Sequence, residues 1–417
     1  MTTYEILKDK FLINGKLIYS EYPECPEQYR GLLMNARFIQ GVFDEKDDRS
    51  RFNRFGEVFD PERNTEKLIE ALPQWYAKGL RAFTVGFQGG GPCFTIDNYT
   101  IENNPFSEDG CSMDEKYLHR MEKLITAADR IGMIVIVSFF YHAQVRFLEN
   151  DIAVLNAVKT ASNWLKEKQF TNVIIEIANE QNAPGFKVHS MLAMEEKVVK
   201  LMQVARRESG GMAVGCSLTG GVFSELLAQE SDVILIHGNG QSRQKFYQLI
   251  KKAQNIRPVK PVVCNEDSQA LSAMQVALEQ EVSWGYYNNI TKQEPPANWG
   301  ITCGEDTFFA LRMAEALGIE KNVLKPEEQF YLQGLEPHME WEGKRWIRLA
   351  SLYPEKIYKV EFYRDGIYYE TAYNDPFTIN FISNWRQGAV EDIKTGEVWL
   401  AKIYLLDGTV IEKEQVV

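Results

Sequence analysis

The chain has 417 residues, of which 45% are hydrophobic and 25% are charged, and these fractions are typical of an ordinary globular protein. Lys and Arg total 46 against 58 Asp and Glu, so the formal net charge is -12 at pH 7. Binding to nucleic acid depends on a surplus of basic residues, and this charge therefore argues against a nucleic-acid partner.

Targeting signals and cysteine motifs are missing from the sequence. The N-terminus lacks a basic segment followed by an apolar run, and no stretch approaches the roughly 20 apolar residues that cross a bilayer. We therefore expect no membrane partner and a cytoplasmic location by default, or a secreted protein if a leader has been removed. The six cysteines show no CxxC pair and no zinc spacing, so neither a metal nor another cofactor is expected. The sequence makes no prediction of the oligomeric state.

Residues 1–30 are expected to form an N-terminal extension. Within it, residues 11–19 predict a hairpin that turns at Asn14-Gly15, because this dipeptide favours two-residue turns.

Residues 31–322 alternate between strand-like and helix-like patterns. The expected strands are 37–43, 82–88, 133–140, 172–179, 211–218, 233–237, 261–266 and 282–287. Helices are expected at 65–78, after a Ser112–Glu115 capping box, and at 152–165, 190–208, 243–253, 270–281 and 306–317. Eight strand–helix units predict an α/β fold of the (β/α)8, or TIM, barrel type.

From about Pro326 the pattern changes to short alternating segments. Residues 358–370 alternate apolar and polar side chains around an Asp-Gly turn, and residues 400–410 follow a looser version of the same pattern. Strands with turn signals and no helix predict a small β-sandwich, of the immunoglobulin or fibronectin kind, over residues 326–417.

Two of the expected strands end in an Asn-Glu dipeptide, at Asn179-Glu180 and at Asn265-Glu266. Barrels gather reactive groups at the carboxyl ends of their strands, where the fourth and seventh strands face each other. Two carboxylates can cleave a glycosidic bond, because one protonates the leaving oxygen while the other attacks or activates water. Glu180 and Glu266 are therefore the candidate catalytic residues, and a solvated rim acid is the alternative for either.

Other polar and aromatic residues near strand ends are candidates for binding a sugar, through hydrogen bonds or through stacking on an aromatic face. This substrate-binding set contains Arg37, Gln88, Tyr141, His142, Asn179, His237, Asn239, Trp284 and Tyr286. Packing within the barrel is the alternative for Trp284, and a hydrogen-bonded rim position is the alternative for the two histidines.

Over residues 31–320 the chain resembles the large clan of retaining glycoside hydrolases with (β/α)8 barrels, which includes the cellulase-like families. The resemblance rests on Asn179-Glu180, Glu266 and Trp284, in that order on strands four, seven and eight. It implies a carbohydrate substrate, with Glu180 as the general acid/base and Glu266 as the nucleophile that forms a glycosyl-enzyme intermediate. It also implies that Asn179 binds the sugar 2-hydroxyl and that Trp284 lies beneath the catalytic subsite.

The sequence departs from the clan at two supporting positions. Strand six of the clan ends with a His and a nearby Tyr, whereas this chain has His237-Gly238-Asn239-Gly240. The strand-two Arg of the clan is also missing, and Arg37 on strand one is the candidate substitute.

Three functions remain open on the sequence. The first is a retaining hydrolase, or a transglycosylase, that acts on β-linked oligo- or polysaccharides. The second is a metal-dependent barrel hydrolase, which five scattered His without an HxH motif disfavour. The third is a carbohydrate-binding barrel protein that has lost its chemistry. The sequence identifies neither the sugar nor endo or exo action.

Overall fold

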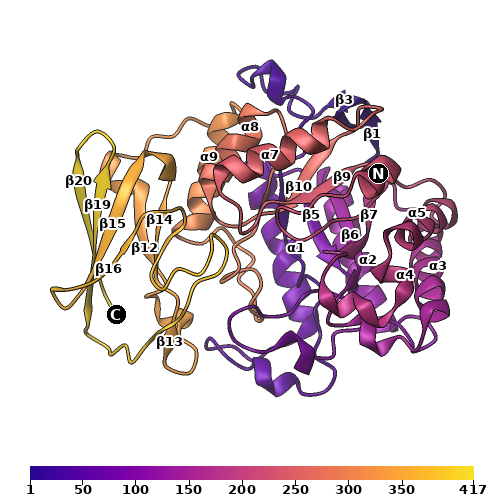
Figure 1. The fold of residues 1–417 in the computed structure, drawn as a ribbon, viewed down its shortest axis with the longest axis horizontal. Coiled ribbons are helices and arrows are strands. Elements are labelled where there is room, and N and C mark those ends of the chain that lie inside the picture. The colour runs from indigo at the N-terminus through magenta and orange to yellow at the C-terminus, as the bar shows by residue number, and fades with distance from the viewer.

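The computed structural model describes residues 1–417, apart from the side chain of His338. The C-terminal strands lie at one end of the long axis, beside helix α9 (Glu305–Ala316), and the N-terminus lies toward the other end (Figure 1).

The first strands form a small antiparallel sheet, consisting of β1 (Tyr4–Leu7), β2 (Lys10–Ile13) and β3 (Lys16–Leu17). The turn between β2 and β3 is Asn14-Gly15, whose φ angles are 52° and 74°. Positive φ at both central residues is what a type I′ turn requires, and the predicted hairpin is confirmed.

Two parallel sheets follow, one with six strands in the order β11-β4-β5-β6-β7-β8 and one that pairs β9 with β10. Backbone contacts connect the sheets on both sides, since Asp232 N–H donates to Val214 C=O and Val263 forms a bridge with Ser283. The strands are β4 (Asn35–Arg37), β5 (Ala82–Gly86), β6 (Ile134–Tyr141), β7 (Val173–Asn179), β8 (Val214–Gly215), β9 (Ile234–His237), β10 (Val262–Glu266) and β11 (Gly285–Tyr286).

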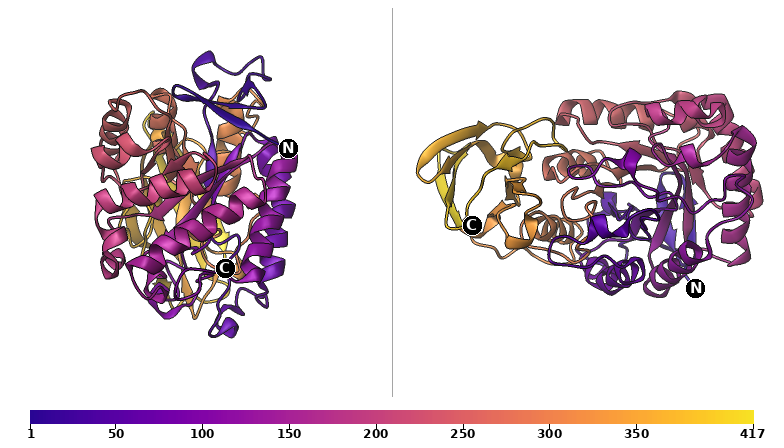
Figure 2. Two further views of the ribbon diagram at one scale, coloured as in Figure 1. Left: turned by 90° about the vertical axis from the view of Figure 1, so that its right-hand side faces the viewer. Right: turned by 90° about the horizontal axis from the view of Figure 1, so that it is seen from below.

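The helices lie on the outside of these strands (Figure 2), and every residue of β6 and β7 is therefore buried. The mixed α/β class that the sequence predicts, with a parallel sheet and outer helices, is confirmed. Besides α9, the helices are α1 (Pro61–Ala77), α2 (Glu115–Ile131), α3 (Asp151–Glu167), α4 (Ser190–Ala193), α5 (Glu195–Glu208), α6 (Glu225–Glu230), α7 (Arg243–Gln254) and α8 (Leu271–Glu279).

Some of the predicted element bounds are wrong for local reasons. The strand expected at 37–43 corresponds to β4, which ends at Arg37. It ends there because the chain turns where Gly41 N–H donates to Phe38 C=O. Helix α2 has Asp114 as its N-cap, whose carboxylate accepts from Lys116 N–H, and the expected Ser112 capping box does not form. The helix expected at 190–208 is divided into α4 and α5.

The C-terminal strands are antiparallel and form three small sheets, with orders β12-β14-β17, β13-β18 and β16-β15-β19-β20. The hairpins predicted at Asp365-Gly366 and Asp407-Gly408 are confirmed, since they join β15 to β16 and β19 to β20. The strands are β12 (Phe330–Gln333), β13 (Lys344–Arg345), β14 (Arg348–Ser351), β15 (Ile357–Arg364), β16 (Ile367–Ala372), β17 (Phe377–Thr378), β18 (Val390–Glu391), β19 (Val398–Leu405) and β20 (Val410–Val416).

A buried ion pair joins the C-terminal strands to the α/β part of the chain. Arg348 on β14 donates to the carboxylate of Glu305 on α9 and to Asn288 Oδ1 at 3.1 Å. Glu305 also accepts from Gln333 Nε2 at 3.2 Å. Burial raises the pKa of Glu305, but the Arg348 guanidinium that contacts this carboxylate favours its ionised form, so the two groups form an ion pair.

Within the part of the chain that the structure describes, no helix is both long enough and apolar enough to cross a membrane.

Candidate active site

Glu180 lies just beyond the C-terminal end of β7, and Glu266 is the last residue of β10. Glu180 has a φ of 56°, in the left-handed region that residues other than Gly seldom adopt. The tight turn that follows is closed by Ala183 N–H, which donates to Glu180 C=O at 2.7 Å. The side chain of Glu180 thereby leaves the strand at its end and is 20% exposed.

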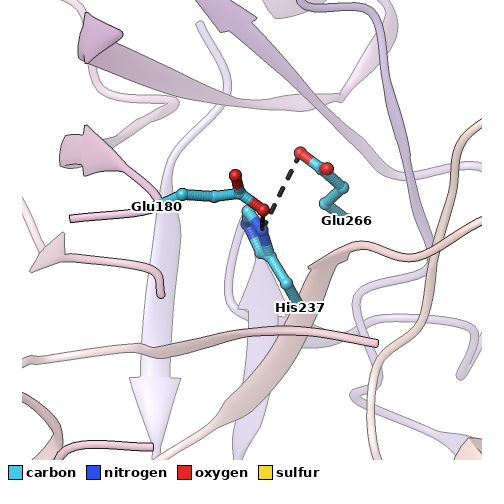
Figure 3. A group of neighbouring side chains, drawn as sticks. All are labelled: Glu180, His237 and Glu266. Atoms are coloured by element: carbon cyan, nitrogen blue, oxygen red, sulfur yellow. Dashed lines mark hydrogen bonds and ion pairs between the residues drawn. The ribbon is translucent and has the colours of Figure 1, made fainter. Parts of the chain in front are cut away.

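His237 at the end of β9 lies between the two glutamates (Figure 3). Its Nδ1 is 3.3 Å from Glu180 Oε1 and 3.8 Å from Glu266 Oε2. One carboxylate oxygen of each glutamate and one ring nitrogen of His237 lie within 4.8 Å of one another. The two carboxylates therefore share one small space at the ends of the strands.

Arg37 and Asn239 hold the carboxylate of Glu266 on two sides. Arg37 Nε lies 2.5 Å from Glu266 Oε2, and Asn239 Nδ2 donates to Glu266 Oε1 at 2.8 Å. A second nitrogen of Arg37 donates to Asn179 Oδ1 at 2.6 Å. Arg37 is itself 1% exposed, so its guanidinium is a fixed positive charge that orients two of the predicted site residues.

The protonation of the site depends on its buried charges. Burial raises the pKa of Glu180, but the hydrogen bond and charge of His237, with the charges of Arg37 and His142, lower it below its ordinary value. Burial also raises the pKa of Glu266, and Arg37 and His237 oppose this effect without reversing it. Burial acts to lower the pKa of His237, but the carboxylates of Glu266 and Glu180 raise it above its ordinary value.

A cavity of about 660 Å³ opens above these residues, a size that suits a small ligand such as one or more sugar rings. Most of the predicted site residues line it, and His237 lies against the two glutamates below. The lining residues from the predicted set are Arg37, Tyr141, His142, Asn179, Glu180, Asn239 and Glu266.

Trp284 and Tyr286, which are predicted substrate-binding residues, do not line this cavity. Trp284 is fully buried, and its indole N–H donates to Asp267 Oδ2 at 2.8 Å. Tyr286 stacks on Phe309 of α9, with ring centroids 4.3 Å apart. Alternate residues of a strand point to opposite faces, so both side chains face the outer helix while Tyr287 faces the cavity.

Gln88, another predicted substrate-binding residue, does not line the cavity either. It is 1% exposed, its Oε1 accepts from Tyr141 N–H at 3.1 Å, and its Nε2 donates to Asn104 Oδ1 at 2.8 Å. Gln88 therefore holds the backbone of Tyr141, a cavity-lining residue, and does not itself reach the cavity.

The structure adds residues that the sequence analysis missed. Tyr287 and Asn289 line the cavity, and each is 2% exposed. Among the described residues, neither the Tyr287 hydroxyl nor Asn289 Oδ1 has a hydrogen-bond partner. Trp385 and Arg386 line it as well, from the C-terminal part of the chain. No local pattern marks Tyr287, which follows the two-residue strand β11, and none marks Trp385.

Glu180, His237 and Glu266 also have the atom types and spacing of a small metal site. The guanidinium of Arg37, however, lies 2.5 Å from Glu266, and a positive charge at that position repels a cation. The residues therefore fit an ion pair with Arg37 better than a divalent metal.

Asp267, which follows Glu266, gives the stability of the fold a predicted pH dependence. Its carboxyl group is fully buried, and burial raises the pKa of Asp267 to about 7 despite the hydrogen bond from Trp284. The folded protein therefore keeps this proton at pH values where the unfolded chain, with an ordinary Asp pKa of about 3.9, has released it. The contribution is full below about pH 4 and is lost as the pH rises through about 7.

We expect the free energy of unfolding to fall by on the order of 3 kcal/mol from this group over that pH range, as measured by urea unfolding. Asp267→Asn stays neutral, and it should flatten the slope of unfolding free energy against pH relative to the wild type. Equal slopes for the two proteins would contradict the assignment.

No family model matches the sequence, and no curated protein matches it. Among solved structures, the chain is similar to a protein from Bacteroides vulgatus ATCC 8482 that is provisionally named a glycoside hydrolase. The identity is 11%, the TM-score is 0.53, and the match covers 94% of this chain and 80% of that chain. An endo-β-1,4-mannanase from Thermotoga petrophila matches with 10% identity and a TM-score of 0.47, over 92% of this chain and 97% of that chain.

A β-glucuronidase from Parabacteroides merdae matches with 11% identity and a TM-score of 0.44, over 99% of this chain and 50% of that chain. The present chain thus spans about half the length of the β-glucuronidase chain that it matches. At these identities, the likeness to the Bacteroides vulgatus protein shows a shared fold and no more.

Proposed function

We propose that this chain is a retaining O-glycoside hydrolase that acts on a β-linked oligo- or polysaccharide. The observation that carries the proposal is the separation of the two glutamates, whose nearest oxygens lie within 4.8 Å of each other. Retaining enzymes place their carboxyl groups roughly 5–5.5 Å apart, and inverting enzymes place them roughly 6.5–9.5 Å apart. The nearest-oxygen separation lies below the inverting range, so it favours direct attack by one carboxylate over activation of an intervening water.

In the proposed mechanism Glu266 is the nucleophile. Its carboxylate attacks the anomeric carbon while Glu180 protonates the leaving oxygen, and Glu180 then takes a proton from the water that hydrolyses the glycosyl-enzyme. Arg37 and Asn239 keep the attacking carboxylate ionised and oriented. Glu180 is the more exposed of the two, with side chains 20% and 9% exposed, which suits the residue that meets water and the leaving group.

The pKa directions of the free protein oppose this division of roles, since the pKa of Glu180 is lowered and that of Glu266 is raised. The contacts of Glu266 favour it, because its carboxylate forms an ion pair with Arg37 and accepts a hydrogen bond from Asn239 Nδ2. A guanidinium at 2.5 Å stabilises the ionised form of its partner directly, and this contact supports Glu266 as the nucleophile. The alternative function, a barrel that binds carbohydrate without cleaving it, rests on the strand-six Tyr and strand-two Arg of the clan, which this chain lacks.

We extend the proposal to the architecture. The two parallel sheets close into one eight-stranded (β/α)8 barrel over residues 31–322, through the backbone contacts at Asp232 and Val263. Residues 1–30 form an extension of this barrel, and residues 326–417 form a β-sandwich domain with its own apolar cluster.

A mechanism-based label tests the function. The protein is incubated with a panel of 2-deoxy-2-fluoro glycosyl fluorides, and its intact mass and then its peptides are measured. We expect a stable adduct on Glu266 with one sugar of the panel, and none on Glu266→Gln.

The site of the adduct separates the alternatives. An adduct on Glu180 would exchange the two roles and keep the retaining mechanism. No adduct with any sugar, together with no hydrolysis of the matching β-linked substrates, would favour carbohydrate binding without cleavage.

A further inference from the structure

A hairpin of the C-terminal part, residues 380–388, reaches the candidate active site. Its tip is a tight turn in which Ser383 N–H donates to Arg386 C=O at 2.8 Å, and Gly388 N–H donates to Asn380 C=O at 2.8 Å further back. Trp385 therefore stands at the tip of a hydrogen-bonded hairpin, where it is half-buried.

Asn384 docks this hairpin on the loop between β9 and α7. Its Nδ2 donates to Gln241 C=O at 2.6 Å, and its Oδ1 accepts from Gly240 N–H. The Trp385 indole lies beside Gly240, which has a φ of 78°, and a Cβ added at this glycine would lie 3.5 Å from the ring. The same loop carries Asn239, which holds Glu266. The hairpin is thus fixed to the segment that positions the proposed nucleophile.

Trp385 and Arg386 line the cavity that also holds Glu180 and Glu266. Trp385 supplies an aromatic surface there, a position that Trp284 does not occupy. The guanidinium carbon of Arg386 lies 5.9 Å from the centroid of the Trp385 ring, so a fork of N–H donors lies near the aromatic surface. A pyranose ring has an apolar face and a rim of hydroxyl groups, and this pair of side chains complements both.

We propose that Trp385 forms an outer subsite, which stacks on a second pyranose ring beside the ring held between the two glutamates. The inference rests on the proposed function and deepens it in two respects. The substrate is an oligosaccharide of at least two rings, and the C-terminal part of the chain contributes directly to its recognition.

Trp385→Ala tests the subsite with two substrates of the same sugar, a β-linked oligosaccharide and the glycosyl fluoride. Fluoride is too small to reach an outer subsite. We expect kcat/KM for the oligosaccharide to fall about tenfold, mainly through KM, because the variant loses one stacked aromatic contact. The value for the fluoride should stay within about twofold of the wild type, and Trp385→Phe should recover most of the loss.

Phe381→Ala is the matched control, because Phe381 is on the same hairpin, is 43% exposed, and does not line the cavity. An unchanged KM for the oligosaccharide in Trp385→Ala would overturn the proposal. So would an equal loss on both substrates, which would place Trp385 at the reacting ring.

The outer subsite can still be tested if the protein has no hydrolase activity. If the wild type hydrolyses nothing, isothermal titration with the same oligosaccharides takes the place of kinetics. Binding weakened about tenfold in Trp385→Ala but not in Phe381→Ala then supports the subsite. Equal binding by all three proteins overturns it, and no binding by the wild type overturns the subsite together with the function.

Discussion

Replacing Glu266 by Gln should lower kcat by several orders of magnitude, about 10⁴-fold or more, while the fold persists. The amide cannot form the glycosyl-enzyme, and it also loses the charge that pairs with Arg37. Turnover of the sugar identified by the trapping experiment measures the effect, and a thermal unfolding curve checks the fold. Glu149→Gln is the control, because Glu149 is an exposed glutamate in the loop after β6.

The same substitution at Glu180 distinguishes the acid/base from the nucleophile. Glu180→Gln should slow the oligosaccharide far more than an aryl glycoside with a good leaving group, because only the poor leaving group needs a proton. Azide added to Glu180→Ala should restore turnover of the aryl glycoside and give the β-glycosyl azide. Wild-type turnover by either Gln variant would remove that glutamate from the mechanism. Formation of the β-glycosyl azide by Glu266→Ala in place of Glu180→Ala would exchange their roles.

Arg348→Met should lower the free energy of unfolding by about 3–5 kcal/mol, the largest stability effect that we expect. The substitution leaves Glu305 buried without its partner. Among the described residues, Arg348 Nε and Nη1 have no hydrogen-bond partner, so the intact pair is itself only partly compensated for its burial. Urea unfolding monitored by tryptophan fluorescence measures the loss.

A double substitution separates two effects of Arg348→Met, the unpaired carboxyl group of Glu305 and the loss of side-chain volume at position 348. Arg348→Met with Glu305→Leu should recover much of the loss, because the second change removes the unpaired buried carboxyl group. Lys344→Met is the control for an exposed pair, since Lys344 and Glu391 have side chains that are 39% and 65% exposed. It should cost less than about 1 kcal/mol. A loss in Arg348→Met no larger than in this control would show that the ion pair does not hold the two parts together.

The sequence was informative where a long pattern repeated. The β-branched runs before Asn179-Glu180 and Asn265-Glu266 predicted both strands and the position of both glutamates at strand ends. Patterns longer than one strand also separated the α/β part from the antiparallel C-terminal part. These features depend on side-chain burial, which the local order of apolar residues records.

The sequence was less informative where a strand was very short, and where a contact joined distant parts of the chain. Strand β11 has two residues, which is too short for alternation to show that Tyr287 and not Tyr286 faces the cavity. The contact of Arg37 with Glu266 agrees with the expectation that Arg37 replaces the strand-two Arg of the clan, whereas Trp385 arrives on a hairpin of the C-terminal part and was not predicted. Such contacts follow from the closure of the tertiary structure, and no neighbouring residue encodes them.

The backbone of Glu180 identifies a conflict between folding and chemistry. At a φ of 56° a glycine would fit with less strain, and a left-handed residue with a side chain costs roughly 1 kcal/mol or more. A chain optimised only to fold would therefore carry Gly at position 180. The glutamate lowers the stability of its own turn, and it places a carboxylate between His237 and the open cavity.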